Sequence, residues 1–179
     1  MTTFSLTIPP DEHRRLVRHL VPRCPKSEEA AFLFCRVQQT KIAMEFHFLD
    51  AHLVGPSEFN YKSLYGIELT DGCRAAVIKH AHDLNASLLE LHSHPRSAVP
   101  EFSASDRSGF AEFVPHVWWR LKNKPYAAIV IGSRGFDSLT WASNPEHPDG
   151  VLDLQVGGRQ LKPTGLTLEN WERRHEFSI

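Results

Sequence analysis

The sequence predicts a single α+β domain, residues 1–179, in which helices flank a mixed central β-sheet. The length of 179 residues is that of one ordinary domain, and a composition with 41% hydrophobic and 23% charged residues suits a packed interior. Short segments with the two-residue period of strands alternate with segments of helical period. Their order along the chain favours one mixed sheet with helices packed on it.

The first part of the chain is expected to contribute several strands and one helix. Polar and apolar residues alternate from Thr3 to Ile8, as in a short strand, and Pro9-Pro10-Asp11 is typical of a helix start. The continuous apolar run from Ala30 to Cys35 favours a strand buried on both faces. The remaining expected elements are a helix that ends before Pro25, a strand over 41–54, a loop over 55–57 and a short strand over 64–69.

The second part is expected to alternate helices with strands. Asp71 is suited to cap a helix that ends at Asn85, because apolar residues after it recur at three- and four-residue steps. A helix from about Ser103 is predicted to be kinked or ended by Pro115. The other expected elements are a strand over 87–92 stopped by Pro95, a hairpin of strands 126–131 and 136–141, and a loop-rich segment from about 144.

Charge and cysteine spacing exclude several classes of protein. With 20 Lys and Arg against 21 Asp and Glu, the chain has no net positive field to attract nucleic acid or an anionic membrane. No long apolar run and no basic-then-apolar N-terminus is present, so we expect neither a membrane span nor a secretory signal, and a cytoplasmic location. Cys24, Cys35 and Cys73 are too widely spaced for a disulfide framework or a thiolate zinc motif. Any metal is therefore expected on His and carboxylate side chains.

One constellation has the spacing of a metal site. On a strand, residues i and i+2 point the same way, so His92 and His94 are expected to face one point in space. A helix that begins near Ser103 can bring the Asp106 carboxylate beside them. Two nitrogens and one oxygen provide three protein ligands for a tetrahedral zinc ion and leave one position open, as in catalytic sites. A base is also needed, and Glu28 or Glu29, at the entrance to a buried strand, is a candidate.

Each feature of this constellation also has a purely structural interpretation. Ser103-x-x-Asp106 matches a helix capping box, and a His-x-His pair can lie on an exposed strand edge. The co-occurrence of these features within fifteen positions favours the metal site. His80-Ala81-His82 provides a contrast, because on a helix its two imidazoles diverge by about 200° and cannot share a metal ion.

The combination resembles the signature of the JAMM, or MPN-plus, metalloproteases, also called JAB domains. That signature is a Glu, then His-x-His-Pro, then Ser-x-x-Asp, matched here by Glu28, by residues 92–95 and by residues 103–106. The resemblance implies an MPN/JAB-like, cytidine-deaminase-like architecture. It also implies that His92, His94 and Asp106 bind zinc, that Glu28 is the general acid and base, and that the Ser103 hydroxyl stabilises the oxyanion.

The match departs from the family pattern at two places. The spacer between His94 and Ser103 is one residue longer than usual, and Cys35 stands where the family has a second Gly. Glu28 places Ala31 three positions later, where the family has a small residue. Glu29 would place Phe32 there. We therefore prefer Glu28 as the base, with Glu29 as the alternative.

The resemblance implies zinc-dependent hydrolysis of the peptide or isopeptide bond after the C-terminus of a ubiquitin-like protein. As a compact, single-domain protein, the chain is similar to bacterial members of the family. Those members are linked to E1-like and E2-like enzymes, including those of ubiquitin-like conjugation systems in phage defence. The expected partners are thus a ubiquitin-like protein and its conjugates, together with such enzymes. Two alternatives are the processing of a ubiquitin-fold sulfur-carrier protein in cofactor biosynthesis and a metal-free MPN scaffold that only binds partners.

Overall fold

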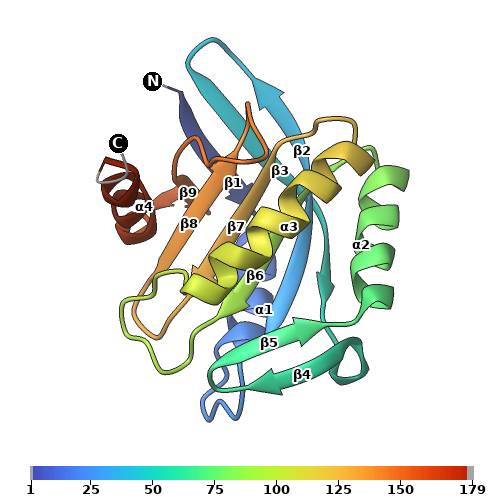
Figure 1. Cartoon of the computed structure of the whole chain (residues 1–179), viewed down its shortest axis with the longest axis vertical. Coiled ribbons are helices and arrows are strands. Elements are labelled where there is room, and N and C mark those ends of the chain that lie inside the picture. Colours follow the sequence, from blue (N-terminus) through green and yellow to red (C-terminus); the bar gives the residue numbers. More distant parts are fainter. Residues whose placement is uncertain (1, 177–179) are drawn as a thin grey trace.

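Within the part of the chain that the structure describes, an eight-stranded sheet forms the centre and four helices pack around it (Figure 1). The computed structural model describes residues 2–176, with side chains described as far as residue 171. The helices are α1 (Pro10–Leu20), α2 (Asp71–Asp83), α3 (Ala104–Arg120) and α4 (Leu166–Glu176), with a short 3-10 helix η1 (Pro56–Glu58). The strands are β1 (Thr3–Ile8), β2 (Ala30–Gln39), β3 (Ala43–Leu53), β4 (Phe59–Ser63), β5 (Gly66–Leu69), β6 (Ser87–Ser93), β7 (Tyr126–Ile131), β8 (Phe136–Trp141), β9 (Leu152–Val156) and β10 (Arg159–Leu161).

The main sheet is mixed, which confirms the predicted α+β class. Its strand order is β10-β9-β1-β3-β2-β6-β7-β8, while β4 and β5 form a separate two-stranded sheet. Strand β1 pairs in parallel with β3 and β9, and β6 pairs in parallel with β7. Strand β2 is antiparallel to both of its neighbours, β3 and β6. The sheet therefore combines strands from both ends of the chain.

The sheet curls until its strand β8 approaches β9 from the other end of the strand order. The Ser138 hydroxyl donates to the carbonyl oxygen of Leu152 at 3.1 Å and accepts from the amide of the same residue at 2.8 Å. An isolated bridge also joins Thr140 to Gly150. The curl lets side chains from distant strands share one core on the concave side.

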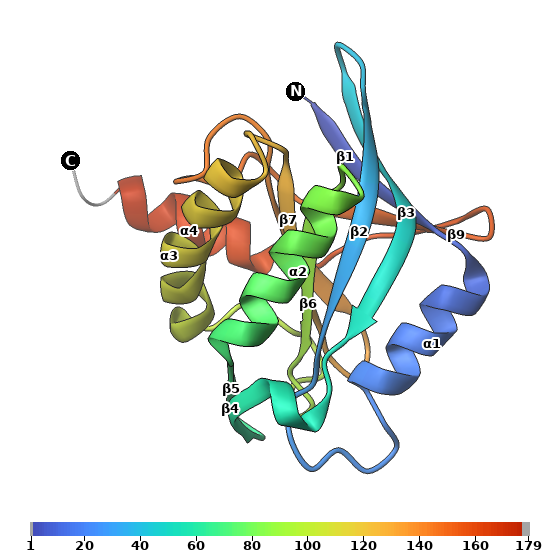
Figure 2. The same ribbon diagram turned by 90° about the vertical axis from the view of Figure 1, so that its right-hand side faces the viewer.

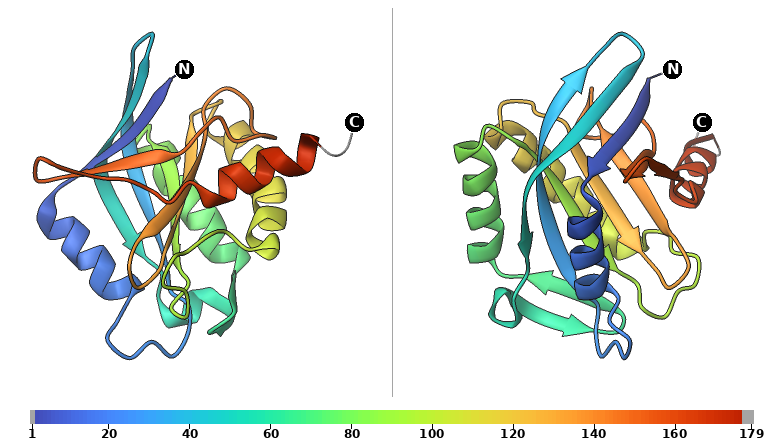
Figure 3. Two further views of the ribbon diagram at one scale, coloured as in Figure 1. Left: turned by 90° about the vertical axis from the view of Figure 1, so that its left-hand side faces the viewer. Right: turned by 180° about the vertical axis from the view of Figure 1, so that it is seen from behind.

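Helices cover both faces of the sheet. Helices α2 and α3 lie on one face and α1 lies on the other, as Figures 2 and 3 show. Two apolar cores result, one under α2 and α3 and one that includes Leu16 and Leu20 of α1. The run from Ala30 to Cys35 is buried at every position and contributes alternately to the two cores, as a strand covered on both faces should. No helix within residues 2–176 has an apolar stretch long enough to cross a membrane.

Several boundaries differ from the sequence prediction. The cap of α2 is Thr70 and not Asp71, because the Thr70 hydroxyl accepts the amide hydrogen of Cys73. Pro115 does not end α3, which continues to Arg120 since Val117 and Trp118 beyond the proline are buried in the core. The predicted loop over 55–57 overlaps η1, and β4, which the pattern did not predict, precedes β5.

The C-terminal segment is more regular than its Pro and Gly content predicts, since it contains β9, β10 and α4. Asp137, buried in β8, accepts hydrogen bonds from the amides of Gly165 and Thr167 and from the Thr167 hydroxyl. The Thr167 oxygen in turn accepts the amide hydrogen of Phe102 at 2.9 Å. Because Phe102 immediately precedes Ser103, this chain of hydrogen bonds anchors the loop that leads into α3.

Candidate metal centre

Strand β6 brings His92 and His94 to the same point, as the two-residue period predicts. The Nε2 atoms of the two imidazoles lie 3.2 Å apart, and His92 is only 2% exposed. Although β6 ends at Ser93, the amide of His94 still donates to the carbonyl oxygen of Ile131 in β7. This hydrogen bond holds His94 in line with the strand, so both rings remain on one face of the sheet.

The start of α3 brings Asp106 to the two imidazoles. The Ser103 oxygen accepts the amide hydrogen of Asp106 at 3.1 Å, and Asp106 Oδ2 accepts the amide hydrogen of Ser103 at 2.7 Å. This reciprocal pair is a capping box, which orients the carboxylate as well as starting the helix. The capping-box interpretation of Ser103-x-x-Asp106 is therefore confirmed, and the same carboxylate lies beside the two imidazoles.

The three side chains have the spacing of ligands around one small cation. Asp106 Oδ1 lies 3.5 Å from His92 Nε2, and Asp106 Oδ2 lies 3.3 Å from His94 Nε2. Zinc bonds of about 2.0–2.1 Å in tetrahedral geometry separate neighbouring ligand atoms by about 3.3–3.4 Å. The 3.2 Å between the two Nε2 atoms agrees with such an edge, and one ligand atom from each of the three side chains lies within 4.8 Å of those of the other two. The residues present thus fit a tetrahedral metal ion that has one position left for another ligand.

Strand register decides which of the two glutamates faces this centre. In the antiparallel β2–β6 pair Ala30 is opposite His92, so Glu28 falls opposite His94 and Glu29 opposite Ser93. Oε1 of Glu28 lies 3.9 Å from His94 Nε2. Glu29 instead exchanges backbone and side-chain hydrogen bonds with Ser93, and its carboxylate pairs with Lys62. The structure therefore brings Glu28, and not Glu29, to the His–Asp cluster.

Glu28 is almost fully buried, with 4% of its surface exposed. Burial raises the pKa of its carboxyl group above the ordinary value, while the nearby His94 and His92 act in the opposite direction. A carboxyl group with a raised pKa is suited to accept and return a proton near neutral pH.

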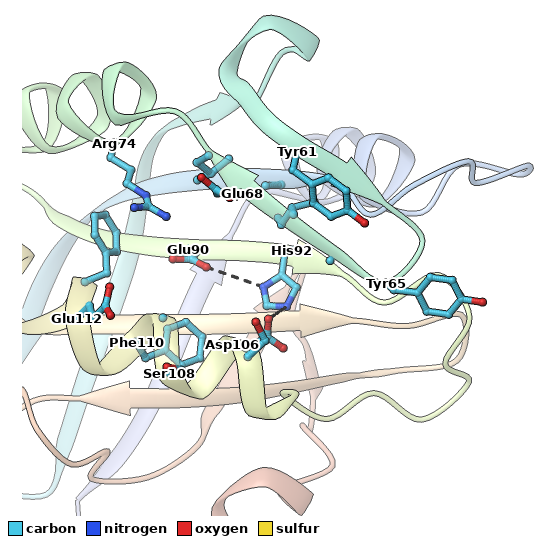
Figure 4. A pocket seen from close by; sticks show the side chains of 17 residues that line it. Tyr61, Tyr65, Glu68, Arg74, Glu90, His92, Asp106, Ser108, Phe110 and Glu112 are labelled. Carbon is cyan, nitrogen blue, oxygen red and sulfur yellow. Dashed lines mark ion pairs between the residues drawn. The ribbon is translucent and has the colours of Figure 1, made fainter.

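Glu90 is a further acidic residue at this centre, which the motif does not include. It precedes His92 by two positions on β6, and its Oε1 lies 3.9 Å from His92 Nδ1, on the side away from Asp106 (Figure 4). The Tyr126 hydroxyl donates to the other Glu90 oxygen at 2.8 Å. The two-residue spacing before His92 could have identified Glu90 from the sequence, because residues i and i+2 of a strand share a face.

Negative charge dominates the surroundings of the two imidazoles. Burial alone disfavours a charged imidazole, but the hydrogen bond and charge of Asp106, with the charges of Glu90 and Glu28, raise the pKa of His92. Burial likewise opposes ionisation of Asp106, yet its contacts with both imidazoles hold the pKa of this carboxyl well below the usual range. Acidic side chains gathered around two imidazoles favour the binding of a cation at this point.

The cluster opens into two adjoining pockets. One, of about 370 Å³, is lined by Glu28, His94, Ser103 and Asp106, so all four of these functional candidates face the same space. The other, of about 490 Å³, is lined by His92, Asp106 and Glu90 and by the exposed Tyr61 of the hairpin (Figure 4). The β4–β5 hairpin borders both pockets through Gly66 and Ile67. A substrate could therefore lie between this hairpin and the start of α3.

The contrast pair His80 and His82 does not form a metal site in the described part of the chain. His80 Nε2 lies 2.8 Å from an Asp50 carboxylate oxygen, and its ring packs edge-on against Phe34. His82 is exposed and pairs with the neighbouring Asp83. Their divergence agrees with the geometry of a helix.

Two comparisons of the sequence with known proteins found no match. No protein-family model matches this sequence, and neither does any curated protein sequence. The chemistry of the centre must therefore follow from its own residues.

Proposed function

We propose that the protein is a zinc-dependent hydrolase of the JAMM type, with an MPN/JAB-like domain, that cleaves the bond after the C-terminus of a ubiquitin-like protein. One observation carries this proposal. Ligand atoms of His92, His94 and Asp106 all lie within 4.8 Å of one another, and Glu28 and Ser103 line the pocket that His94 and Asp106 also line. A scaffold that only binds partners has no need of this arrangement, with a buried acidic group beside three metal ligands.

The side chains supply the groups that amide hydrolysis needs. His92, His94 and Asp106 would hold the zinc ion, which when bound would supply a Lewis acid for a carbonyl group and for water near neutral pH. Glu28 Oε1 accepts a proton from the attacking water and returns it to the nitrogen of the departing amine. The Ser103 oxygen serves as an acceptor in the helix cap, so its hydroxyl hydrogen can donate to the carbonyl oxygen as negative charge develops there.

The shape of the surroundings supports an extended peptide as substrate. Strand β5 pairs with β4 and with no other strand among the described residues, so one of its edges is open for an added strand. Gly66 and Ile67 of this strand line the pocket that contains Glu28 and His94. The C-terminal tail of a ubiquitin-like protein is such an extended segment, and E1-like and E2-like enzymes that charge that tail are the expected further partners.

Cleavage of defined fusions tests this function. We expect the purified full chain to release a reporter fused after the C-terminus of a ubiquitin-like domain, or a lysine conjugated to it. A chelator should abolish cleavage and added zinc should restore it. Replacement of the terminal Gly of the tail by a bulky residue should slow cleavage strongly, since a narrow groove admits only small side chains. Efficient digestion of casein, or indifference to the Gly replacement, would contradict the ubiquitin-like substrate.

The choice of fusion separates the two enzymatic alternatives. A ubiquitin-fold sulfur carrier presents a similar extended tail to the same pocket, so the chemistry at Glu28 would be unchanged. Preferential cleavage of a sulfur-carrier fusion over conjugates to lysine would assign the protein to precursor processing instead of deconjugation.

A further inference from the structure

A second group of metal-ligand side chains lies at the base of the β4–β5 hairpin, outside the centre described above. His52 comes from β3, Glu58 from η1, and Cys73 from the first turn of α2. One ligand atom of each residue lies within 4.8 Å of those of the other two. His52 and Glu58 are six residues apart and Cys73 follows fifteen positions later, a spacing that matches no metal motif recognised in the sequence.

Hydrogen bonds already hold the three side chains together. His52 Nε2 lies 2.9 and 3.0 Å from the two Glu58 oxygens, and the amide of Gly55 donates to Glu58 Oε2 at 2.7 Å. The Cys73 thiol also hydrogen-bonds to Glu58 and is 3% exposed. Burial and the Glu58 charge raise the pKa of the thiol to about 12, so without a cation Cys73 stays protonated and donates to the carboxylate.

The donor set is selective for one class of cation. A sulfur, an imidazole nitrogen and a carboxylate oxygen together are ligands of zinc and similar borderline-soft divalent ions. Calcium and magnesium prefer oxygen ligands throughout. His52 and Glu58 are only half-buried, which leaves a solvent-facing side for entry of an ion and for a water molecule as fourth ligand.

We infer that His52, Glu58 and Cys73 form a second binding site for a divalent cation of the zinc class. Glu58 directly precedes β4 and Cys73 follows β5 by a few residues, so the cation joins the two ends of the hairpin. The backbone already closes there, because the amide of Thr70 donates to the carbonyl oxygen of Glu58 at 2.8 Å. The ion would therefore stabilise the base of the segment that borders the candidate active site. This inference depends on its own three ligands and not on the proposed hydrolysis.

Cobalt(II) provides a direct test, because a thiolate ligand produces an intense sulfur-to-cobalt charge-transfer absorption that imidazole and carboxylate ligands do not. We expect the metal-free full chain to bind two equivalents of Co²⁺ and to develop this near-ultraviolet band with one of them. Cys73→Ser should lose the band and one equivalent. Cys24→Ser is the matched control, since Cys24 is an exposed cysteine outside the cluster. This variant should keep the band and both equivalents of Co²⁺. Asp106→Ala should keep the band and lose the other equivalent.

The outcomes for the two metal sites are separable. Absence of the band from the wild-type protein, or its persistence in Cys73→Ser, would overturn the second site while leaving the His92–His94–Asp106 centre untouched. If Cys73→Ser does not fold, His52→Gln preserves the buried cysteine and should weaken Co²⁺ binding at the thiolate site at least tenfold. Unchanged affinity in that variant, with the band still present, would remove His52 from the ligand set and overturn the site as inferred.

Discussion

Oε1 of Glu28 lies 3.9 Å from Nε2 of His94, whereas the carboxylate of the adjacent Glu29 pairs with Lys62. The antiparallel register of β2 and β6 produces this separation, because neighbouring residues of a strand point to opposite faces. The candidate base therefore lies on the face that carries the metal ligands. The same register pairs Glu29 with Ser93, which connects the start of β2 to the end of β6.

The metal ligands can be tested one at a time by zinc content. We expect His92→Ala, His94→Ala and Asp106→Ala each to lose one equivalent of zinc, because two remaining protein ligands hold the ion too weakly to survive dialysis. His80→Ala should keep its full zinc content, since His80 contacts Asp50 and Phe34 instead. Full zinc occupancy in all three ligand variants, measured by elemental analysis, would show that the ligand assignment is wrong.

Glu28→Gln should retain zinc and fold but lose hydrolysis by about 10²–10⁴-fold, the usual contribution of a general acid–base group. The amide keeps the size of the side chain and cannot take up a proton. Glu29→Gln should remain active, because the carboxylate of Glu29 points to Lys62 and not into the pocket. Steady-state cleavage of the fusion substrate decides between the two glutamates. Loss of activity in Glu29→Gln alone would assign the role of general base to Glu29.

Ser103 has two roles that different substitutions can separate. Ser103→Gly should lower the stability of the protein by only a few tenths of a kcal/mol, since glycine is tolerated at a helix N-cap. Its cleavage rate should nevertheless fall about 10²–10³-fold, because the donor to the developing oxyanion is missing. Ser103→Thr keeps both the cap and the hydroxyl and should stay active. Thermal unfolding and kcat are measured for both variants. A Ser103→Gly variant that keeps its cleavage rate, or a rate loss that only follows a loss of stability, would contradict the role of the hydroxyl as a donor.

Glu90 is expected to act as a positioning residue for His92. Its carboxylate lies on the Nδ1 side of the ring, where carboxylate partners of metal-bound histidines orient the imidazole and increase its basicity. We expect Glu90→Gln to weaken zinc affinity at this centre by about 10–100-fold. Glu68→Gln is the control, because Glu68 lines the same pocket but hydrogen-bonds to Asn60. Competition with a metal-sensitive dye measures the zinc affinity of each variant. Equal affinities in the two variants would contradict the role of Glu90.

Asp137 is expected to be a major determinant of stability although it lies outside the metal centre. Asp137→Ala removes the acceptor for the amides of Gly165 and Thr167, and Thr167 is buried. Buried donors without partners are destabilising, and we expect a loss of about 3 kcal/mol in the free energy of unfolding. Asp153→Ala should lower the free energy of unfolding much less, because it removes only exposed contacts with Gln160 and Lys162. Chemical denaturation of the two variants would show similar stabilities if the anchoring of α4 were unimportant.

The local part of the candidate site could be predicted from the sequence. His92 and His94 share a face because the period of a strand is two residues, and Asp106 is oriented by a capping box of only four residues. The α+β class followed in the same way from local periodicity. Boundaries were less predictable, because burial of Val117 and Trp118 carries α3 past Pro115 and because Thr70 offers a better cap than Asp71.

Other features depend on contacts between residues distant in the chain. The family resemblance favoured Glu28 over Glu29, but the register of β2 against β6 is what brings Glu28 to the His–Asp cluster. Likewise, only the tertiary fold brings Cys73 of α2 to His52 and Glu58. The regular structure after residue 144 likewise depends on pairing of β9 with β1. Local patterns fix backbone conformation and side-chain face over a few residues, but partners across a sheet are chosen by the burial and hydrogen bonding of the whole fold.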